Sequence, residues 1–515
     1  MTSVFGVARP VFFHLLVTGF VVLAGMLSPA TAAAGEAGRD SVVIGMVLEP
    51  PHLDPTAGAA AAIGEVVYAN VFEGLTRIDE RGEVVPGLAE GWDISPDGLT
   101  YTFHLRDRVR FHNGYALTAD MVRQNLDALS APSGVNPQKR LFEDIESVAV
   151  AGERTVVVKL SRLSGRFLFN LGLPAALILS RHENVDNKTR PVGTGPFVFS
   201  RWYRGDRLEL VRNPDYWGEP AALSRVTFRF ISDPTAALAG MLSGDIDGFP
   251  NFPAPESLVR FQMEPGLRVT VGATQGKTIL ALNNARKPLN DIRVRRAIAH
   301  AVDRAVVIRD VENGAAVPIG SHMVPMEPGY VDLTGFYPHD VEKAKALLKE
   351  AGVEHPRIEI AMPPPAYARR GGEVLAYQLE KAGISVVLRQ MEWAEWLSGV
   401  FHGKDFDATV IAHVEPFDLD IYARPDYYFG YDSAVYQLIY QRLATEMNGE
   451  RRRELVAEAQ RIIAEDCVNV FLFLLPKIGV WNAKLEGYWT NVPVPANDMT
   501  GVRWTVDADG RGWWQ

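Results

Sequence analysis

The sequence predicts an α/β protein with more than one domain, and length, composition and an alternation of elements support this. The chain has 515 residues, of which 47% are hydrophobic, which is enough apolar material for several cores. From about residue 340, segments with helical spacing of apolar residues alternate with short apolar segments. This alternation is typical of a largely parallel sheet covered by helices.

The first 160 residues predict mainly strands. Residues 42–46 are apolar, and residues 99–105 alternate apolar and polar side chains after the turn signal Asp97-Gly98, which favours a hairpin. Residues 147–151 and 155–160 are predicted to pair with each other across a short turn. Further strands are expected at 205–211, 226–230 and 278–282.

Start and stop signals define the helices of this half. Thr118 can cap a helix, and Asp233-Pro234 can begin another that Gly244 ends. A helix at 293–301 follows from apolar residues at helical spacing, whereas prolines and glycines predict irregular structure between Phe249 and Pro265. In the second half, helices are expected at 340–351, 373–382, 392–401 and 448–465, and strands at 357–361, 384–388 and 407–411.

The N-terminal residues are typical of an export signal. Arg9 precedes a mostly apolar stretch at 11–26, and Ala30-Thr31-Ala32 is a small-x-small cleavage site, so residues 1–34 are predicted to be a signal peptide. The only cysteine, Cys467, lies far from this signal, which predicts neither a lipid tether nor an intramolecular disulfide. Its apolar surroundings predict a buried, unreactive thiol. We expect a free periplasmic protein.

Charge and motifs exclude several classes of function. The formal net charge of −10 argues against a nucleic-acid partner, which requires a basic surface. No metalloprotease, phosphate-loop or serine-hydrolase motif is visible. His104 and His112 are eight residues apart, unlike zinc ligand pairs, so a structural role is expected for His112. Neither a catalytic set, a metal site nor a cofactor is predicted.

Several motifs keep a fixed order along the chain. The clearest run, between Gly193 and Phe249, contains G-T-G-P-F, R-N-P-D-Y-W and S-G-D-I-D-G-F. Before it stand F-E-G-L at 72–75, P-G-L-A-E-G-W at 86–92 and F-H-N-G at 111–114, and A-L-N-N at 281–284 follows. Together they resemble the solute-binding proteins of dipeptide, oligopeptide and nickel importers, solute-binding protein family 5. Turn residues explain most of these motifs as scaffold.

This resemblance implies a two-lobed periplasmic binding protein fold of the cluster C type, with an extra subdomain in the N-terminal lobe. It places lobe I at 35–274 and lobe II at 275–478, with residues 479–515 returning to lobe I. The crossing segments are expected near 272–279 and 475–484. The expected partners are a ligand between the lobes and the membrane permease and ATPase subunits of an ABC importer. A monomer is expected.

Ligand recognition is predicted in the loop 413–431, H-V-E-P-F-D-L-D-I-Y-A-R-P-D-Y-Y-F-G-Y. It follows a predicted strand end, where α/β domains place their ligands. Peptide-binding relatives carry an aspartate here that pairs with the peptide's α-ammonium group. The resemblance places Asp418 in this role, with Glu415 and Asp420 as alternatives, although the Gly-Trp pair of those relatives is absent. Tyr427 and Tyr428 would line the site.

Other residues are weaker candidates for the same site. Glu49 follows the first strand and could meet a cation. Tyr367, Arg369 and Arg370 follow the Pro363-Pro364-Pro365 break, where a relative can engage a ligand carboxylate.

The sequence features bear on three candidate functions. Capture of a peptide or peptide-like, amino-bearing solute is favoured by the whole set of motifs. A nickel chelate with His413 as a direct ligand would use the same fold. A secreted peptide hydrolase would need a nucleophile and base, or a metal set, and the sequence contains no recognisable set of either kind.

Overall fold

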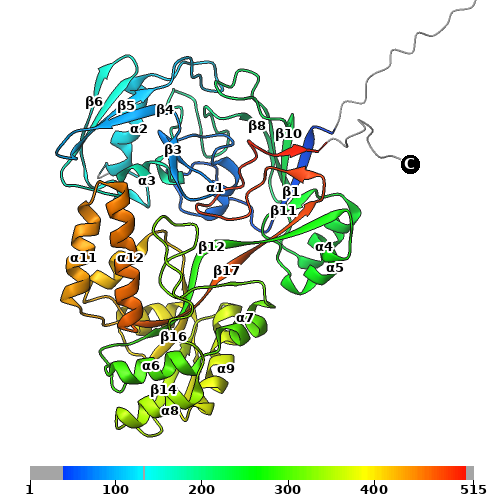
Figure 1. Ribbon diagram of the computed structural model, residues 1–515. Coiled ribbons are helices and arrows are strands. Elements are labelled where there is room, and N and C mark those ends of the chain that lie inside the picture. Colours follow the sequence, from blue (N-terminus) through cyan, green and yellow to red (C-terminus); the bar gives the residue numbers. More distant parts are fainter. Residues whose placement is uncertain (1–38, 132–133, 506–515) are drawn as a thin grey trace, which may run out of the picture. The chain divides into compact units, whose positions relative to one another are not determined.

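The computed structural model describes residues 39–131 and 134–505, and the predicted signal peptide lies outside them. These described residues belong to one compact unit (Figure 1). Within the described residues, no helix combines the length and the apolar composition that crossing a bilayer requires.

The largest sheet among the described residues has eleven strands in the order β15-β14-β16-β12-β17-β11-β1-β10-β9-β8, with β13 paired to β17. These strands are β1 (Ser41–Met46), β8 (Phe197–Tyr203), β9 (Arg207–Arg212), β10 (Arg225–Phe230), β11 (Gly248–Phe249), β12 (Leu267–Leu282), β13 (Val317–Pro318), β14 (Arg357–Met362), β15 (Ser385–Gln390), β16 (Ala408–His413) and β17 (Asn469–Asn482). A largely parallel sheet is confirmed for β15-β14-β16. The prediction of parallel pairing is wrong for β12 and β17, which run antiparallel to each other.

Strands β12 and β17 are the longest of the sheet, and they pair from Leu267↔Asn482 to Ala281↔Asn469. Only residues 278–282 were expected as a strand here, because the preceding glycines and polar residues hide the pattern. The ladder is irregular between Ala273 and Lys277, where β12 carries extra residues. The two predicted crossing segments fall within or just beyond these strands (Figure 1).

A second sheet has the order β4-β5-β7-β6, with the strands β4 (Ala89–Ile94), β5 (Thr100–Leu105), β6 (Ile145–Gly152) and β7 (Thr155–Leu160). Its buried face holds Tyr101, Phe103 and Val156, against which helix α2 (Ala119–Ser130) packs Val122. The Thr118 hydroxyl accepts a hydrogen bond from the Met121 amide, as a cap requires. Small two-stranded sheets join β2 (Thr76–Ile78) to β3 (Val84–Pro86), and β18 (Leu485–Glu486) to β19 (Arg503–Trp504).

Glu73 joins three of the sequence motifs through hydrogen bonds. Its buried carboxyl group accepts hydrogen bonds from the Thr194 hydroxyl (2.8 Å), the Tyr216 hydroxyl (2.9 Å) and the Trp217 indole (2.9 Å). These residues come from the F-E-G-L, G-T-G-P-F and R-N-P-D-Y-W segments. Gly193 and Gly195 lie directly against the backbone near Val71, where a β-carbon would collide with it. The motifs therefore form one scaffold.

The helices of the first half are α1 (Ala61–Val67), α2, α3 (Phe167–Leu171), α4 (Pro234–Ser243) and α5 (Leu258–Gln262). Asp233 caps α4 through the Ala236 amide, and Gly244 ends it with φ +78, as predicted. Helix α5 was not predicted, because the prolines of the segment 249–265 indicated irregular structure. Pro255 instead stands at the first position of the short 3-10 turn that precedes α5, where proline is tolerated.

The second half contains α6 (Ile292–Ala301), α7 (Arg304–Glu312), α8 (Val341–Glu350), α9 (Ala366–Lys381), α10 (Trp393–Glu395), α11 (Ala434–Thr445) and α12 (Gly449–Glu465). Helix α9 begins earlier than expected, directly after Pro365, and α10 continues as a π-helix over Trp396–His402. Cys467 is a buried free thiol, and burial raises its pKa to about 11, as predicted for an unreactive group.

Candidate ligand-binding site

The predicted ligand loop, residues 413–431, begins in the last residue of β16 and turns sharply at Phe417. Phe417 has φ +51, in the left-handed region, and a 3-10 helix over Asp418–Ala423 follows directly. Asp418 is consequently turned inward and is only 6% exposed. The loop therefore covers this carboxylate instead of presenting it to solvent.

Two buried nitrogens hold the Asp418 carboxylate. His322 Nε2 lies 3.0 Å from Oδ2, and Lys277 Nζ lies 3.0 Å from Oδ1. The lysine contact is an ion pair without hydrogen-bond alignment, since Oδ1 has no aligned donor. Lys277 Nζ instead donates to the Glu415 carbonyl oxygen, 2.7 Å away. Burial alone raises the pKa of Asp418, but His322 and Lys277 outweigh it and hold the pKa well below its usual range.

Both histidines of the cluster are oriented by tyrosines. An ionised carboxylate only accepts, so His322 donates Nε2–H to Asp418, and its Nδ1 accepts from the Tyr422 hydroxyl at 2.9 Å. His413 Nε2 lies 3.0 Å from the Tyr428 hydroxyl, and its Nδ1 lies 3.9 Å from Asp418 Oδ2. Burial lowers the pKa of both rings, that of His413 to about 3. Both are neutral near pH 7.

Glu327 is a second buried carboxyl group beside Lys277, at 4% exposure. Its oxygens accept from the amides of Phe417 (2.9 Å) and Val324 (3.3 Å). Burial raises the pKa of Glu327, and Lys277 lowers it only in part. Lys277 therefore has two buried carboxyl groups near its ammonium group, those of Asp418 and Glu327.

His322, His413 and Asp418 could also hold a metal ion, because one donor atom from each lies within 4.8 Å of the others. The tyrosines on the far nitrogens would orient such ligands. Lys277 opposes this, since its ammonium group already lies against Asp418. The donor set fits a cation only if the lysine withdraws.

The remaining candidates of the loop have different surroundings. Glu415 is exposed, and its side chain accepts from the Val414 amide at 3.2 Å. Asp420 forms an ion pair with Arg424 four residues later. Tyr427 is half-buried and Tyr428 fully buried, both packed against Phe429.

The candidates outside the loop are not all brought to it. Tyr367 is close, because its hydroxyl accepts from the Ala412 amide at 3.1 Å. Glu49 accepts instead from the Trp202 indole (2.9 Å) and the Gly205 amide (3.0 Å). Arg369, on α9, lies 3.6 Å from Glu392. No contact of Glu49 or Arg369 with the cluster is found among the described residues.

Sequence reasoning missed Lys277, His322 and Glu327. Lys277 stands in β12, beside apolar residues that were expected to begin the strand at 278. His322 and Glu327 lie between β13 and α8, where no periodicity marks them. The available signal was weak: a lysine next to an apolar strand is uncommon unless it is paired.

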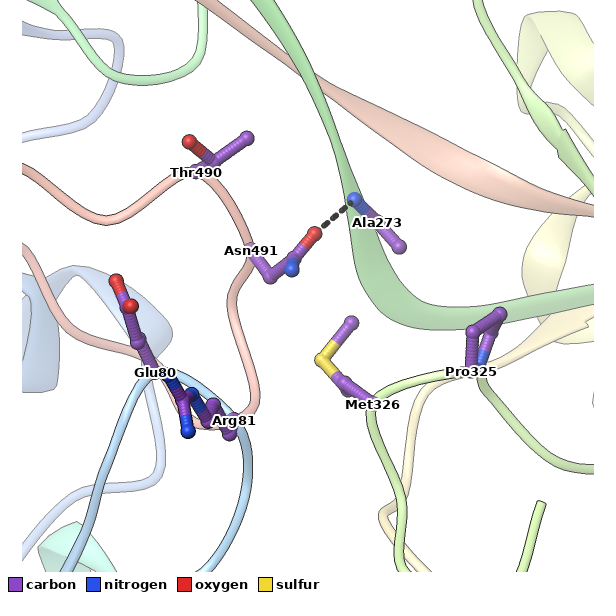
Figure 2. Close-up of a pocket in the computed structure, with 7 residues that line it drawn as sticks. All are labelled: Glu80, Arg81, Ala273, Pro325, Met326, Thr490 and Asn491. Carbon is purple, nitrogen blue, oxygen red and sulfur yellow. Dashed lines mark hydrogen bonds between the residues drawn. The ribbon is translucent and has the colours of Figure 1, made fainter.

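A separate pocket of about 410 Å³ lies beside β12 and contains none of the cluster residues (Figure 2). Asn491 closes part of it by accepting from the Ala273 amide at 3.0 Å. Its lining residues are Glu80, Arg81, Ala273, Pro325, Met326, Thr490 and Asn491.

Comparison with known proteins places this architecture in a family. The model of the bacterial extracellular solute-binding proteins, family 5 middle, matches residues 83–433. Di/tripeptide-binding protein 4 of Pseudomonas aeruginosa (strain UCBPP-PA14) is 33% identical over 407 residues, 72% of this chain and 76% of that protein. The nickel-binding periplasmic protein of Escherichia coli (strain K12) is 30% identical over 365 residues, 69% and 67% of the two chains.

The solved structure of HbpA2 from Haemophilus parasuis superposes with a TM-score of 0.83 at 23% identity, covering 90% of this chain and 100% of that one. The fold is accordingly the two-lobed α/β fold that the motifs implied. The length of the family match then settles the classification. This chain belongs to the bacterial extracellular solute-binding proteins of family 5.

Proposed function

We propose that this chain is the substrate-binding component of an ABC importer, and that it captures a peptide or peptide-like, amino-bearing solute. The observation that carries this proposal is the family match over residues 83–433, which includes the whole loop 413–431 above the buried cluster. Di/tripeptide-binding relatives support the ligand class. The solute would be handed to the permease and ATPase subunits of the importer.

We further propose that the protein is exported, loses residues 1–34 and acts as a periplasmic monomer. Lobe I would comprise 35–274 and lobe II 275–478, with 479–515 returning to lobe I. The proposed boundaries fall within β12 and β17, whose long mutual pairing supports them as the crossing strands. A ligand can shift such lobes only through contacts that it makes better in the closed form.

The proposed ligand surface is the loop 413–431 with the residues beneath it. His413, Asp418 and Tyr428 form its buried part, and Glu415, Asp420 and Tyr427 its more accessible part. Tyr367 supports the base of the loop through the Ala412 amide. A ligand-binding role for Glu49 and Arg369 stays a prediction.

Native mass spectrometry of protein purified from its own periplasm tests the proposal directly. We expect a bound amino-bearing solute, released intact on denaturation, together with saturable rebinding in calorimetry. Binding is proposed to occur without turnover. A cleaved or altered product that accumulates in proportion to protein concentration would contradict the proposal.

A nickel chelate is the second candidate, because His322, His413 and Asp418 offer three donor atoms close together. The nickel-binding relative adds weight to it. Lys277 argues against it, since a second cation would have to displace its ammonium group. Calorimetry with Ni²⁺, alone and with a small carboxylate chelator, separates the two candidates.

A further inference from the structure

Two of the three carboxylates at the start of the loop 413–431 already have a cation of the protein as partner. Asp418 has the Lys277 ammonium group at 3.0 Å, and Asp420 is paired with Arg424. Glu415 forms no ion pair with any residue in the described ranges 39–131 and 134–505. It is also the exposed member of the three.

Lys277 is fixed in place from several directions. Its backbone pairs with His413 of β16 on one edge and with Leu474 of β17 on the other. Its side chain is 0% exposed, and its Nζ atom donates to the Glu415 carbonyl oxygen. The sheet therefore holds its backbone, and Asp418 and the Glu415 carbonyl oxygen hold its ammonium group.

Displacement of Lys277 by a ligand would be unfavourable. A ligand cation that took the Asp418 carboxylate would deprive the buried lysine ammonium group of its ion-pair partner at 3.0 Å. Glu327 would remain near it, but the oxygens of Glu327 already accept from two amides, so the arrangement would be destabilising. His322 and His413 add no negative charge that could accommodate a second cation. The Lys277 ammonium group against Asp418 thus opposes the binding of a ligand cation there.

We propose that Lys277 is a tethered ammonium group that closes the Asp418 carboxylate to ligand cations, and that Glu415 is the carboxylate that receives the amino group of the solute. The identity of the ligand's partner rests on the proposed function, whereas the role of Lys277 does not. Lys277 acts here as a positioning residue for specificity. It occupies the buried carboxylate of Asp418, so that the exposed carboxylate of Glu415 is the one left to bind the amino group of the solute.

The geometry of Glu415 supports the second part of the proposal. The Val414 amide donates to one of its oxygens at 3.2 Å and so orients the carboxylate. Its charge adds to the effect of burial in raising the pKa of Tyr427, which places the two side chains in the same neighbourhood. An oriented, exposed carboxylate without a cation among the described residues as its partner suits an alkylammonium group.

Chemical rescue tests the role of Lys277 without a known ligand. Thermal unfolding of the wild type, Lys277→Ala and Lys277→Ala with Asp418→Asn is followed in propylammonium chloride and in potassium chloride of equal ionic strength. We expect propylammonium to raise the Tm of Lys277→Ala by several degrees and to leave the other two unchanged, because a ligand stabilises only the state that binds it. Lys277→Gln serves as a second variant if the alanine protein does not fold.

Two outcomes of this experiment would overturn the proposal. Equal stabilisation of the wild type and Lys277→Ala would mean that Asp418 is open to cations in the natural protein. Absence of rescue in both lysine variants would mean that Lys277 does not fill a cation position.

Calorimetry with the dipeptide Ala-Leu and its N-acetyl form tests Glu415. Glu415→Gln should weaken Ala-Leu binding at least about tenfold, since a charge-assisted contact is lost. The neutral pair Lys277→Met with Asp418→Asn should weaken it less, and Glu380→Gln, an exposed carboxylate of α9 outside the loop, is the matched control. A larger loss of Ala-Leu affinity in the double variant than in Glu415→Gln would overturn the assignment to Glu415. If the wild type binds neither compound, the peptide function fails, and the rescue experiment still decides the role of Lys277.

Discussion

The Tyr428 hydroxyl lies 3.0 Å from His413 Nε2, and the two rings are parallel to within 7°. His413 is the last residue of β16, and Tyr428 lies near the far end of the same loop. One buried hydrogen bond therefore joins the two ends of the proposed ligand loop. A loop held in this way loses less conformational freedom when it binds a solute.

Tyr428→Phe should lower the free energy of unfolding by about 1–2 kcal/mol, because the buried imidazole loses its partner. Urea unfolding measures this. Tyr377→Phe is the matched control, since Tyr377 is 61% exposed, and it should change stability by less than about 0.5 kcal/mol. Equal stability of Tyr428→Phe and the wild type would show that the hydrogen bond contributes nothing net.

Stability should fall as the pH is lowered from about 6.5 to 4. Burial lowers the pKa of His413 from 6.5 to about 3 and that of His112 to about 4, so the unfolded chain binds more protons in this window. Each such histidine contributes up to about 1.4 kcal/mol per pH unit. His112→Gln should flatten the slope of unfolding free energy against pH, and an unchanged slope would contradict the assignment.

The fold was largely predictable because local signals agree with the tertiary structure. The caps at Thr118 and Asp233, and the stop at Gly244, have the predicted geometry. The length of β12 and β17 was not predictable, because their pairing joins segments about 200 residues apart and tolerates polar residues that break a local pattern.

The candidate site was predictable only where it is continuous in sequence. His413, Asp418 and Tyr428 lie in one loop after a strand, and the structure brings them together. Lys277 and His322 reach the same cluster from other segments, and a charge balance between distant residues leaves no periodic signal in the sequence. The pairing of Asp418 with Lys277 was therefore outside the reach of sequence reasoning.

Gly272→Ala should destabilise the protein by about 1–3 kcal/mol, as overpacked cores do. A β-carbon at Gly272 of β12 would lie 1.9 Å from the Thr490 carbonyl oxygen, so the backbone must move. Gly91→Ala in β4 is the matched control, because no atom lies within 4 Å of the added carbon. Thermal unfolding of both variants checks this. A smaller loss for Gly272→Ala than for Gly91→Ala would mean that the segment around Thr490 yields easily.

Lys477→Met should stabilise the protein at pH 7 by about 2 kcal/mol, because it removes a charge from an apolar setting. Lys477 pairs with Gly272 across the ladder and is 5% exposed, and its ammonium group donates to the Trp489 carbonyl oxygen at 3.4 Å. Burial lowers its pKa to about 8, although Glu65 acts in the opposite direction.

A lysine with a depressed pKa binds fewer protons when folded, so its destabilising effect is full below about pH 8 and fades as the pH rises toward 10.5. The gain from Lys477→Met should therefore shrink over that range in urea unfolding. The exposed Lys343→Met is the control and should change stability little at any pH. If Lys477→Met is less stable than the wild type at pH 7, the attraction of Glu65 outweighs the burial of the ammonium group.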